Sequence, residues 1–144
     1  MIEIERKFLV INNKYQNAKN VRIRQGYVCS TDNRVVRVRV KGEHGYLTLK
    51  NSTVGFARNE YEYEIPVDEA NEMLETMCRK PIIDKIRYLY EYAGHLWEVD
   101  EFHGSHEGLV VAEIELEHIN DAFEKPDFVG EEVTGNPRYY NSNL

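Results

Sequence analysis

The sequence is poor in cysteine and has no long apolar run. Its 144 residues include only two cysteines, Cys29 and Cys78, which do not form a C-x-x-C pair. This argues against a disulfide framework or a thiolate metal site and favours a reducing, cytoplasmic setting. No uncharged stretch approaches the roughly 20 apolar residues of a membrane span, and the N-terminus lacks the layout of a signal peptide. We therefore expect an unprocessed cytoplasmic protein with no membrane partner.

Two further absences narrow the function. The formal net charge of −7 argues against a surface devoted to nucleic acid. No G-x-x-x-x-G-K-[ST] loop occurs, so any phosphate group would be bound by side chains instead of a backbone loop. The length and the 42% hydrophobic content fit a single domain over residues 1–144.

What the sequence does contain is alternation of apolar and polar residues. Eight segments with this period-two pattern predict strands: 2–11, 20–29, 34–41, 45–51, 58–66, 81–92, 95–102 and 109–117. Short glycine-containing connections predict antiparallel pairing between most neighbours. One helix is expected after Pro66, with Asp68 as its N-cap and an end at Lys80-Pro81. A short terminal helix is expected within 135–144.

Nearly every predicted strand contributes charged residues to one face. In the first strand, Glu3, Glu5 and Lys7 share a face, and successive side chains on that face lie about 6.5 to 7 Å apart. Across the other strands the basic positions on such faces are Arg37, Arg39, Lys50, Lys85 and Arg87. The acidic positions are Glu62, Glu64, Glu98, Asp100, Glu113 and Glu115.

Two interpretations fit this charged surface. It could be the solvated face of an open antiparallel sheet, which requires no function. Alternatively, eight strands could close into a barrel whose polar faces converge on a central space. A dry interior of this kind is unfavourable because each buried ion costs several kcal/mol before compensation. A polyanion with divalent cations would satisfy both sets: carboxylates take Mg²⁺ or Mn²⁺, and Arg and Lys take phosphate oxygens. A linear triphosphate is the ligand that fits best.

An ordered set of short motifs supports the second interpretation. It comprises Glu3-x-Glu5-x-Lys7, Val36-Arg37-Val38-Arg39, Leu47-Thr48-Leu49-Lys50, Glu62-Tyr63-Glu64, Lys85-Ile86-Arg87, Glu98-Val99-Asp100 and Ala112-Glu113-Ile114-Glu115. Over residues 2–140 this set resembles the CYTH family, also called triphosphate tunnel metalloenzymes. The resemblance implies a mainly β (α+β) fold: an eight-stranded antiparallel closed β-barrel, or triphosphate tunnel, with helices packed outside.

The resemblance also implies residue roles. The principal metal carboxylates would be Glu3, Glu5, Glu113 and Glu115, with Glu62, Glu64 and Asp100 in support, holding Mg²⁺ or Mn²⁺ as two ions. The triphosphate would be bound by Lys7, Arg37, Arg39, Lys50, Lys85 and Arg87, and the catalytic set would be Glu3, Glu5, Lys7, Glu113 and Glu115. Family members commonly continue beyond Asn141, so closure of that end of the tunnel is left open.

Several other residues are weaker candidates. Arg58 is expected at the surface more than at the ligand, and Tyr27 is expected outside the sheet. Arg22 and Arg24 either extend the basic site or form surface ion pairs. His103-x-x-His106 has metal-ligand spacing but lies in a glycine-containing turn, and Arg138 either caps the tunnel or lies on a helix surface.

The preferred function is hydrolysis of inorganic tripolyphosphate to phosphate and pyrophosphate, because the compact chain offers little extra sequence for a nucleoside pocket. The alternatives are a class IV-type adenylate cyclase, a thiamine or nucleoside triphosphatase acting on an organic triphosphate, and a non-catalytic polyphosphate-binding module. Outward-facing tyrosines such as Tyr61 and Tyr63 also raise the expectation of a homodimer.

Overall fold

The computed structural model describes residues 2–31, 33–51 and 57–144. Within them the strands are β1 (Ile2–Val10), β2 (Lys19–Ser30), β3 (Arg34–Lys41), β4 (His44–Asn51), β5 (Ala57–Ile65), β6 (Ile83–Tyr92), β7 (His95–His103), β8 (Val110–Leu116) and β9 (Val129–Glu132). The helices are α1 (Val67–Thr76) and three short 3₁₀ turns, η1 (Gly104–His106), η2 (Pro137–Tyr139) and η3 (Asn141–Asn143). The mainly β fold with one α-helix is confirmed.

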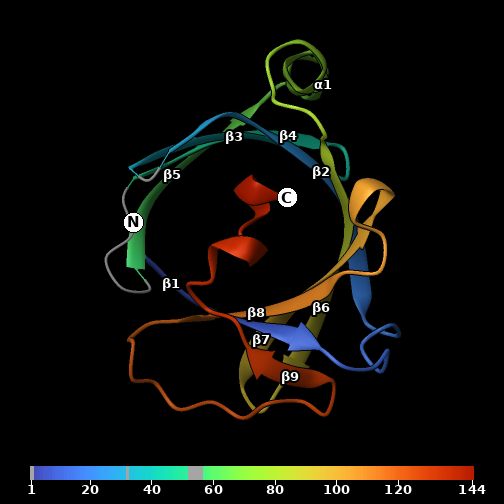
Figure 1. Cartoon of the computed structure of the whole chain (residues 1–144), viewed down its shortest axis with the longest axis vertical. Coiled ribbons are helices and arrows are strands. Elements are labelled where there is room, and N and C mark those ends of the chain that lie inside the picture. The colour runs from blue at the N-terminus through green and yellow to red at the C-terminus, as the bar shows by residue number, and fades with distance from the viewer. Residues whose placement is uncertain (1, 32, 52–56) are drawn as a thin grey trace.

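All the strands belong to one antiparallel sheet in the order β5-β4-β3-β2-β6-β7-β8-β1-β9. The expectation of eight strands in a closed barrel is wrong on both counts. The described residues form nine strands, because β9 adds to β1 beyond the predicted set. The sheet curls into a ring (Figure 1), but β1 and β5 pair only through Ile2–Ile4 and Ala57–Asn59. The two sides thus meet at a short contact instead of a continuous ladder.

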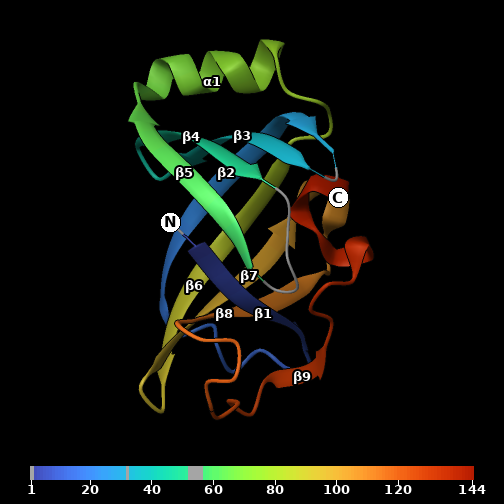
Figure 2. The same ribbon diagram turned by 90° about the vertical axis from the view of Figure 1, so that its left-hand side faces the viewer.

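Helix α1 packs against the outside of β3 and β4 (Figure 2). Its buried residues Ala70 and Leu74 join Val38 and Val40 in one apolar cluster. Gly45 makes the close approach possible, since a Cβ there would lie 2.7 Å from the Cβ of Ala70. The N-cap is Pro66 and not Asp68, because the helix begins at Val67 and Asp68 lies in its first turn. That position still suits an acid beside the positive end of the helix dipole.

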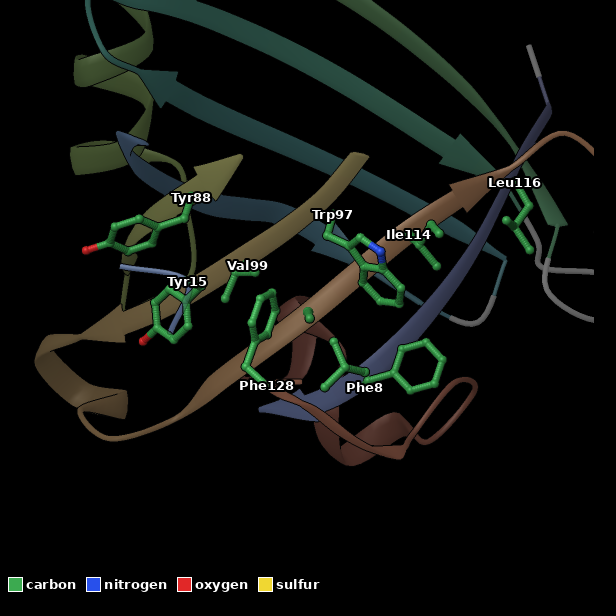
Figure 3. Close-up of a cluster of buried hydrophobic side chains, with 10 residues drawn as sticks. Phe8, Tyr15, Tyr88, Trp97, Val99, Ile114, Leu116 and Phe128 are labelled. Atoms are coloured by element: carbon green, nitrogen blue, oxygen red, sulfur yellow. The ribbon is translucent and has the colours of Figure 1, made fainter. Parts of the chain in front are cut away.

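The largest apolar cluster also lies outside the ring. Figure 3 shows outward-facing side chains of β1, β7 and β8, including Phe8, Trp97 and Ile114, packed with Phe128. Tyr15, from the segment between β1 and β2, contacts Tyr88 and Phe128 with ring centroids 5.1 and 5.8 Å apart. The apolar faces of the strands are therefore covered from outside, which leaves their charged faces directed inward.

The C-terminal segment lies within the ring of strands (Figure 1). Residues 135–144 form the two short 3₁₀ helices η2 and η3 in place of one terminal helix. Leu144 packs against a small cluster of Ile83, Phe102 and Val111. Each of these three residues lies two positions from a charged residue on the same inward face, Lys85, Asp100 or Glu113, so together they form an apolar plug at one end of the ring.

Some outward-facing residues remain uncovered. Tyr61 and Tyr63 on β5 are 49% and 59% exposed, whereas Tyr88 is buried.

In the described part of the chain, no helix has both the length and the hydropathy that a membrane crossing demands.

Candidate active site

The strand register brings the inward-facing charges together. Residues directly opposite each other on paired strands share a face. Lys7 lies opposite Glu113, and Arg87 lies opposite Asp100. On the other side of the ring, Arg37 lies opposite Thr48, and Thr48 lies opposite Glu62. The inner surface therefore alternates basic and acidic groups around the ring.

On β6 and β7 these charges satisfy one another. Asp100 is fully buried and accepts hydrogen bonds from Lys85 Nζ at 2.8 Å and from Arg87 Nε and NH2 at 2.8 and 2.9 Å. Arg87 NH1 reaches Glu98 at 3.3 Å. We call Lys85, Arg87, Glu98 and Asp100 the paired wall.

The paired wall has strongly shifted acidities. Burial lowers the pKa of Lys85 to about 7, and the nearby arginines add to this effect while Asp100 only partly opposes it. Burial alone would raise the pKa of Asp100, but Arg87 and Lys85 hold it well below its usual range. The carboxylate is thus the anion that keeps two buried cations in place.

On the opposite side of the ring, basic side chains surround a cavity of about 130 Å³. Its lining includes Lys7, Arg37, Lys50 and Arg58, one from each of four strands, with Glu5 beside them. Tyr27 and the C-terminal residues 133–135 and 140–142 complete the lining. We call these four basic residues the cavity wall. They give the cavity the charge that an anionic ligand requires.

Arg37, in the cavity wall, is buried and has both carboxylate and hydroxyl neighbours. Its NH2 group lies 3.4 Å from Glu62 and 3.8 Å from Glu60, and it donates to Thr48 Oγ1 at 3.3 Å. Thr48 in turn donates to Glu62 at 2.8 Å. Among the described residues the buried Nε of Arg37 has no hydrogen-bond partner. A buried N–H without an acceptor is costly, so this group is ready to bind a ligand oxygen.

Lys7 connects the cavity to the acidic strand β8. Its ammonium lies 3.7 Å from Glu113 and donates to the carbonyl oxygen of Tyr139 at 2.9 Å. Burial lowers the pKa of Lys7, but the charges of Glu113 and Glu5 outweigh it and the net pKa is raised. Burial would raise the pKa of Glu113, yet Lys7 and a hydrogen bond with Glu5 lower it to about 2. Both groups are therefore ionised near neutral pH.

Arg39 has a different environment from the other buried arginines. Its Nε donates to Gln25 Oε1 at 2.8 Å, and Gln25 Nε2 donates to the hydroxyl of Tyr27 at 3.2 Å. Burial lowers the pKa of Arg39 to about 9, with Arg37 and Arg87 adding to the effect.

The remaining predicted acids are more peripheral. Glu64 is largely exposed and lies 2.9 Å from His44, and Glu62 is also open to solvent on one side. Glu115 is exposed and lies opposite Glu5 on the neighbouring strand. Glu3 pairs with Arg58 through the backbone, and its side chain lies outside the described residues.

The structure corrects the expectations for Tyr27 and Arg58 and decides between the two interpretations of Arg22 and Arg24. The inward face of β2 carries Gln25 and Tyr27, so Tyr27 lines the cavity instead of packing outside. Arg22 and Arg24 point outward, where they bind Asp84 and Asn71. Arg58, expected mainly at the surface, lines the cavity because β5 curls back to meet β1.

Two other candidates are surface features. His103 lies 2.9 Å from Glu101 and 3.3 Å from Glu107, and Arg138 is exposed beside the ring of Tyr139. No group of three or more His, Cys, Asp or Glu side chains is arranged as a metal site within residues 2–31, 33–51 and 57–144.

A curled antiparallel sheet with inward charges and a basic cavity defines a class of anion-binding domain. The CYTH domain model matches residues 1–142, and this chain belongs to that family. It is 57% identical to an inorganic triphosphatase of Acetivibrio thermocellus, over 99% of this chain and 92% of the relative. An inorganic triphosphatase of Nitrosomonas europaea is 39% identical, over 100% of this chain and 97% of the relative.

Solved structures agree with this assignment. A crystal structure of an inorganic triphosphatase superposes with a TM-score of 0.71 at 36% identity, covering 98% of this chain and 92% of the other. The family expectation drawn from the ordered motifs is therefore confirmed.

Proposed function

We propose that this protein hydrolyses inorganic tripolyphosphate to phosphate and pyrophosphate in the basic cavity. The observation that carries the proposal is the cavity wall, with Lys7, Arg37, Lys50 and Arg58 contributed by four different strands. Convergent cations of this kind suit a compact ligand with several phosphate groups. The inorganic triphosphatases at 57% and 39% identity support the same substrate.

The triphosphate would be held by side chains alone. Lys7 and Lys50 offer ammonium groups, and Arg37 offers the unpartnered Nε described above. Arg39, Lys85 and Arg87 stand behind them as further positive charge. These groups bind and orient the ligand and offset negative charge that develops on its oxygens during hydrolysis.

The carboxylates fit a hard divalent cation by their chemistry. Glu5 lies within hydrogen-bonding distance of Glu113, and paired carboxylate oxygens are the donors that Mg²⁺ and Mn²⁺ prefer. We assign Glu3, Glu5, Glu113 and Glu115 as the principal ligands of two ions, with Glu62, Glu64 and Asp100 in support. When bound, such ions neutralise phosphate charge and supply an activated water.

The substrate assignment is tested by phosphate release from tripolyphosphate with Mg²⁺ or Mn²⁺, with ATP and thiamine triphosphate in parallel and EDTA as the control. We expect fast, metal-dependent release that favours tripolyphosphate. Formation of cyclic AMP and pyrophosphate from ATP, without tripolyphosphate turnover, would instead establish a cyclase. Binding without turnover of any of the three would establish a non-catalytic module.

The metal assignment is tested with Glu5→Gln. This variant keeps the size of the side chain but removes its charge, so metal-dependent turnover should fall by about 100-fold or more. Glu117→Gln, an exposed change just after β8 with the same loss of charge, should behave as the wild type. Unchanged metal-dependent turnover in Glu5→Gln would remove that residue from the metal site.

A further inference from the structure

Gln25 lies at the centre of the inner face of β2 and has no role in the proposed chemistry so far. It is fully buried and sits directly opposite Arg39 on β3. Its carbonyl oxygen accepts from Arg39 Nε at 2.8 Å, and its amide donates to the Tyr27 hydroxyl at 3.2 Å. A buried amide with both ends engaged is held in one orientation.

The partner of Arg39 differs in charge from the partners of the other buried arginines. Arg87 is held by the carboxylate of Asp100, and Arg37 lies near the carboxylates of Glu60 and Glu62. Among the described residues, Arg39 has no carboxylate within ion-pair distance, and its side-chain hydrogen bond goes to the neutral Gln25. Arg39 is therefore oriented without being neutralised.

This difference matters for anion binding. A carboxylate opposite Arg39 would hold the guanidinium as firmly, but it would also cancel the positive charge that attracts phosphate. A neutral amide fixes Nε and leaves the positive charge of the guanidinium uncancelled. The contact of Gln25 with Tyr27, which lines the cavity, connects this arrangement to the binding site.

We propose that Gln25 is a positioning residue that orients Arg39 toward the triphosphate while preserving the positive charge of the arginine. The proposal rests on the proposed function, because it assumes that the anion in the cavity is tripolyphosphate. It predicts that a negative charge introduced at position 25 lowers the affinity for tripolyphosphate without lowering the stability of the fold.

The test is Gln25→Glu, which keeps the size of the side chain and the oxygen that accepts from Arg39, while the Tyr27 hydroxyl becomes the donor to the new carboxylate. Affinity for tripolyphosphate is measured by calorimetry on metal-free protein, and stability is measured by thermal unfolding. We expect the Kd to rise about tenfold, as for loss of a charge partner in a binding site, while Tm stays level or rises because Arg39 gains an ion pair. Asn17→Asp makes the same change of net charge at an exposed position between β1 and β2, and it should leave both the Kd and Tm unchanged.

A second variant, Gln25→Met, keeps the volume but removes both hydrogen bonds. Arg39 then keeps its charge and loses its orientation, so we expect a higher KM for tripolyphosphate with a smaller change in kcat. An unchanged Kd in Gln25→Glu, or an effect no larger than that of Asn17→Asp, would overturn the proposal.

The binding measurement separates this proposal from the proposed function. If wild-type protein binds tripolyphosphate without hydrolysing it, the catalytic assignment fails and a Kd shift in Gln25→Glu still supports the role of Gln25. If wild-type protein does not bind tripolyphosphate, both proposals are overturned.

Discussion

Both sides of the ring carry inward-facing lysine and arginine side chains, but these cations have different surroundings. In the paired wall, Asp100 is bound by both Lys85 and Arg87, and all three are buried. In the cavity wall, Arg37 has a buried Nε without a partner in the described part of the chain and faces an open space. One side binds its cations to a single buried carboxylate, and the other arranges its cations around a cavity.

This contrast shows that inward charge alone does not define a binding residue. The motifs of β6 and β7 look as functional in sequence as those of β3 and β4. In the structure, the Asp100 network is closed by its own hydrogen bonds. Under the function proposed above, the cavity wall would contact the ligand directly and the paired wall would lie behind it as an electrostatic support. Experiments that separate stability from activity can break or sharpen this division.

The largest expected effect is on stability, from Asp100→Ala. Removing this carboxylate leaves the buried Lys85 without its carboxylate partner and Arg87 with only the longer contact to Glu98, and breaking a buried pair typically costs about 3 to 5 kcal/mol. The free energy of unfolding from urea titration should fall by this amount. Asp84→Ala breaks the more exposed pair with Arg22 and should cost less than about 1 kcal/mol. Equal losses in the two variants would contradict a special role for the paired wall.

A second prediction concerns the cavity wall. Arg37→Gln removes a buried donor to the ligand, so kcat/KM for tripolyphosphate should fall about 100-fold. Because the cavity side is partly open, the free energy of unfolding should change by only about 1 kcal/mol. Arg34→Gln, an exposed change on the same strand, is the control. A variant that unfolds easily but retains full turnover would reverse the assignment of the two walls.

The smallest effect is expected in the outer layer, where the buried hydroxyl of Tyr15 donates to Glu101 at 2.8 Å. Burial, together with this bond, raises the pKa of Tyr15. Its stabilisation is therefore present below the ordinary tyrosine pKa of about 10 and is lost as the pH rises above that value. Tyr15→Phe should lower the free energy of unfolding by about 1 to 2 kcal/mol at pH 7.

The check is urea unfolding at pH 7 and above pH 10. The difference in free energy of unfolding between wild type and Tyr15→Phe should narrow at the higher pH. At that pH Tyr15 loses its proton more readily in the unfolded chain than in the folded protein, and this favours unfolding of the wild type only. A gap that stays constant across this range would show that the Tyr15 bond is independent of protonation.

The alternation in the sequence predicted most of the strands and most of the inward charges. Period-two patterning placed Glu5, Lys7, Arg37 and Lys50 on inner faces, and the structure brings all four to one cavity. The expectation that the charges face inward was correct because apolar residues such as Val38 and Trp97 need cover that the ring interior does not supply.

The wrong predictions have physical causes that lie in contacts between strands, and the pattern within one segment does not report such contacts. β2 has polar residues on both faces, so Arg24 and Gln25 were equally acceptable as inward positions until pairing with β3 set the register. Strand β9 is only four residues long and follows an irregular segment, and it forms because β1 offers a free edge there. The short pairing between β1 and β5 depends on the curvature of the whole sheet, which cannot be predicted from the sequence of one strand.

The C-terminal segment within the ring has a consequence for biosynthesis. Lys7 belongs to the first strand, yet its backbone and ammonium bond residues 133, 134 and 139, which emerge from the ribosome more than 120 residues later. Until those residues have been made, Lys7 lacks these hydrogen-bond partners and β1 lacks its pairing with β9. The surroundings of Lys7 are therefore completed only after residues 133–139 have been synthesised, so a strand made first depends on a segment made much later.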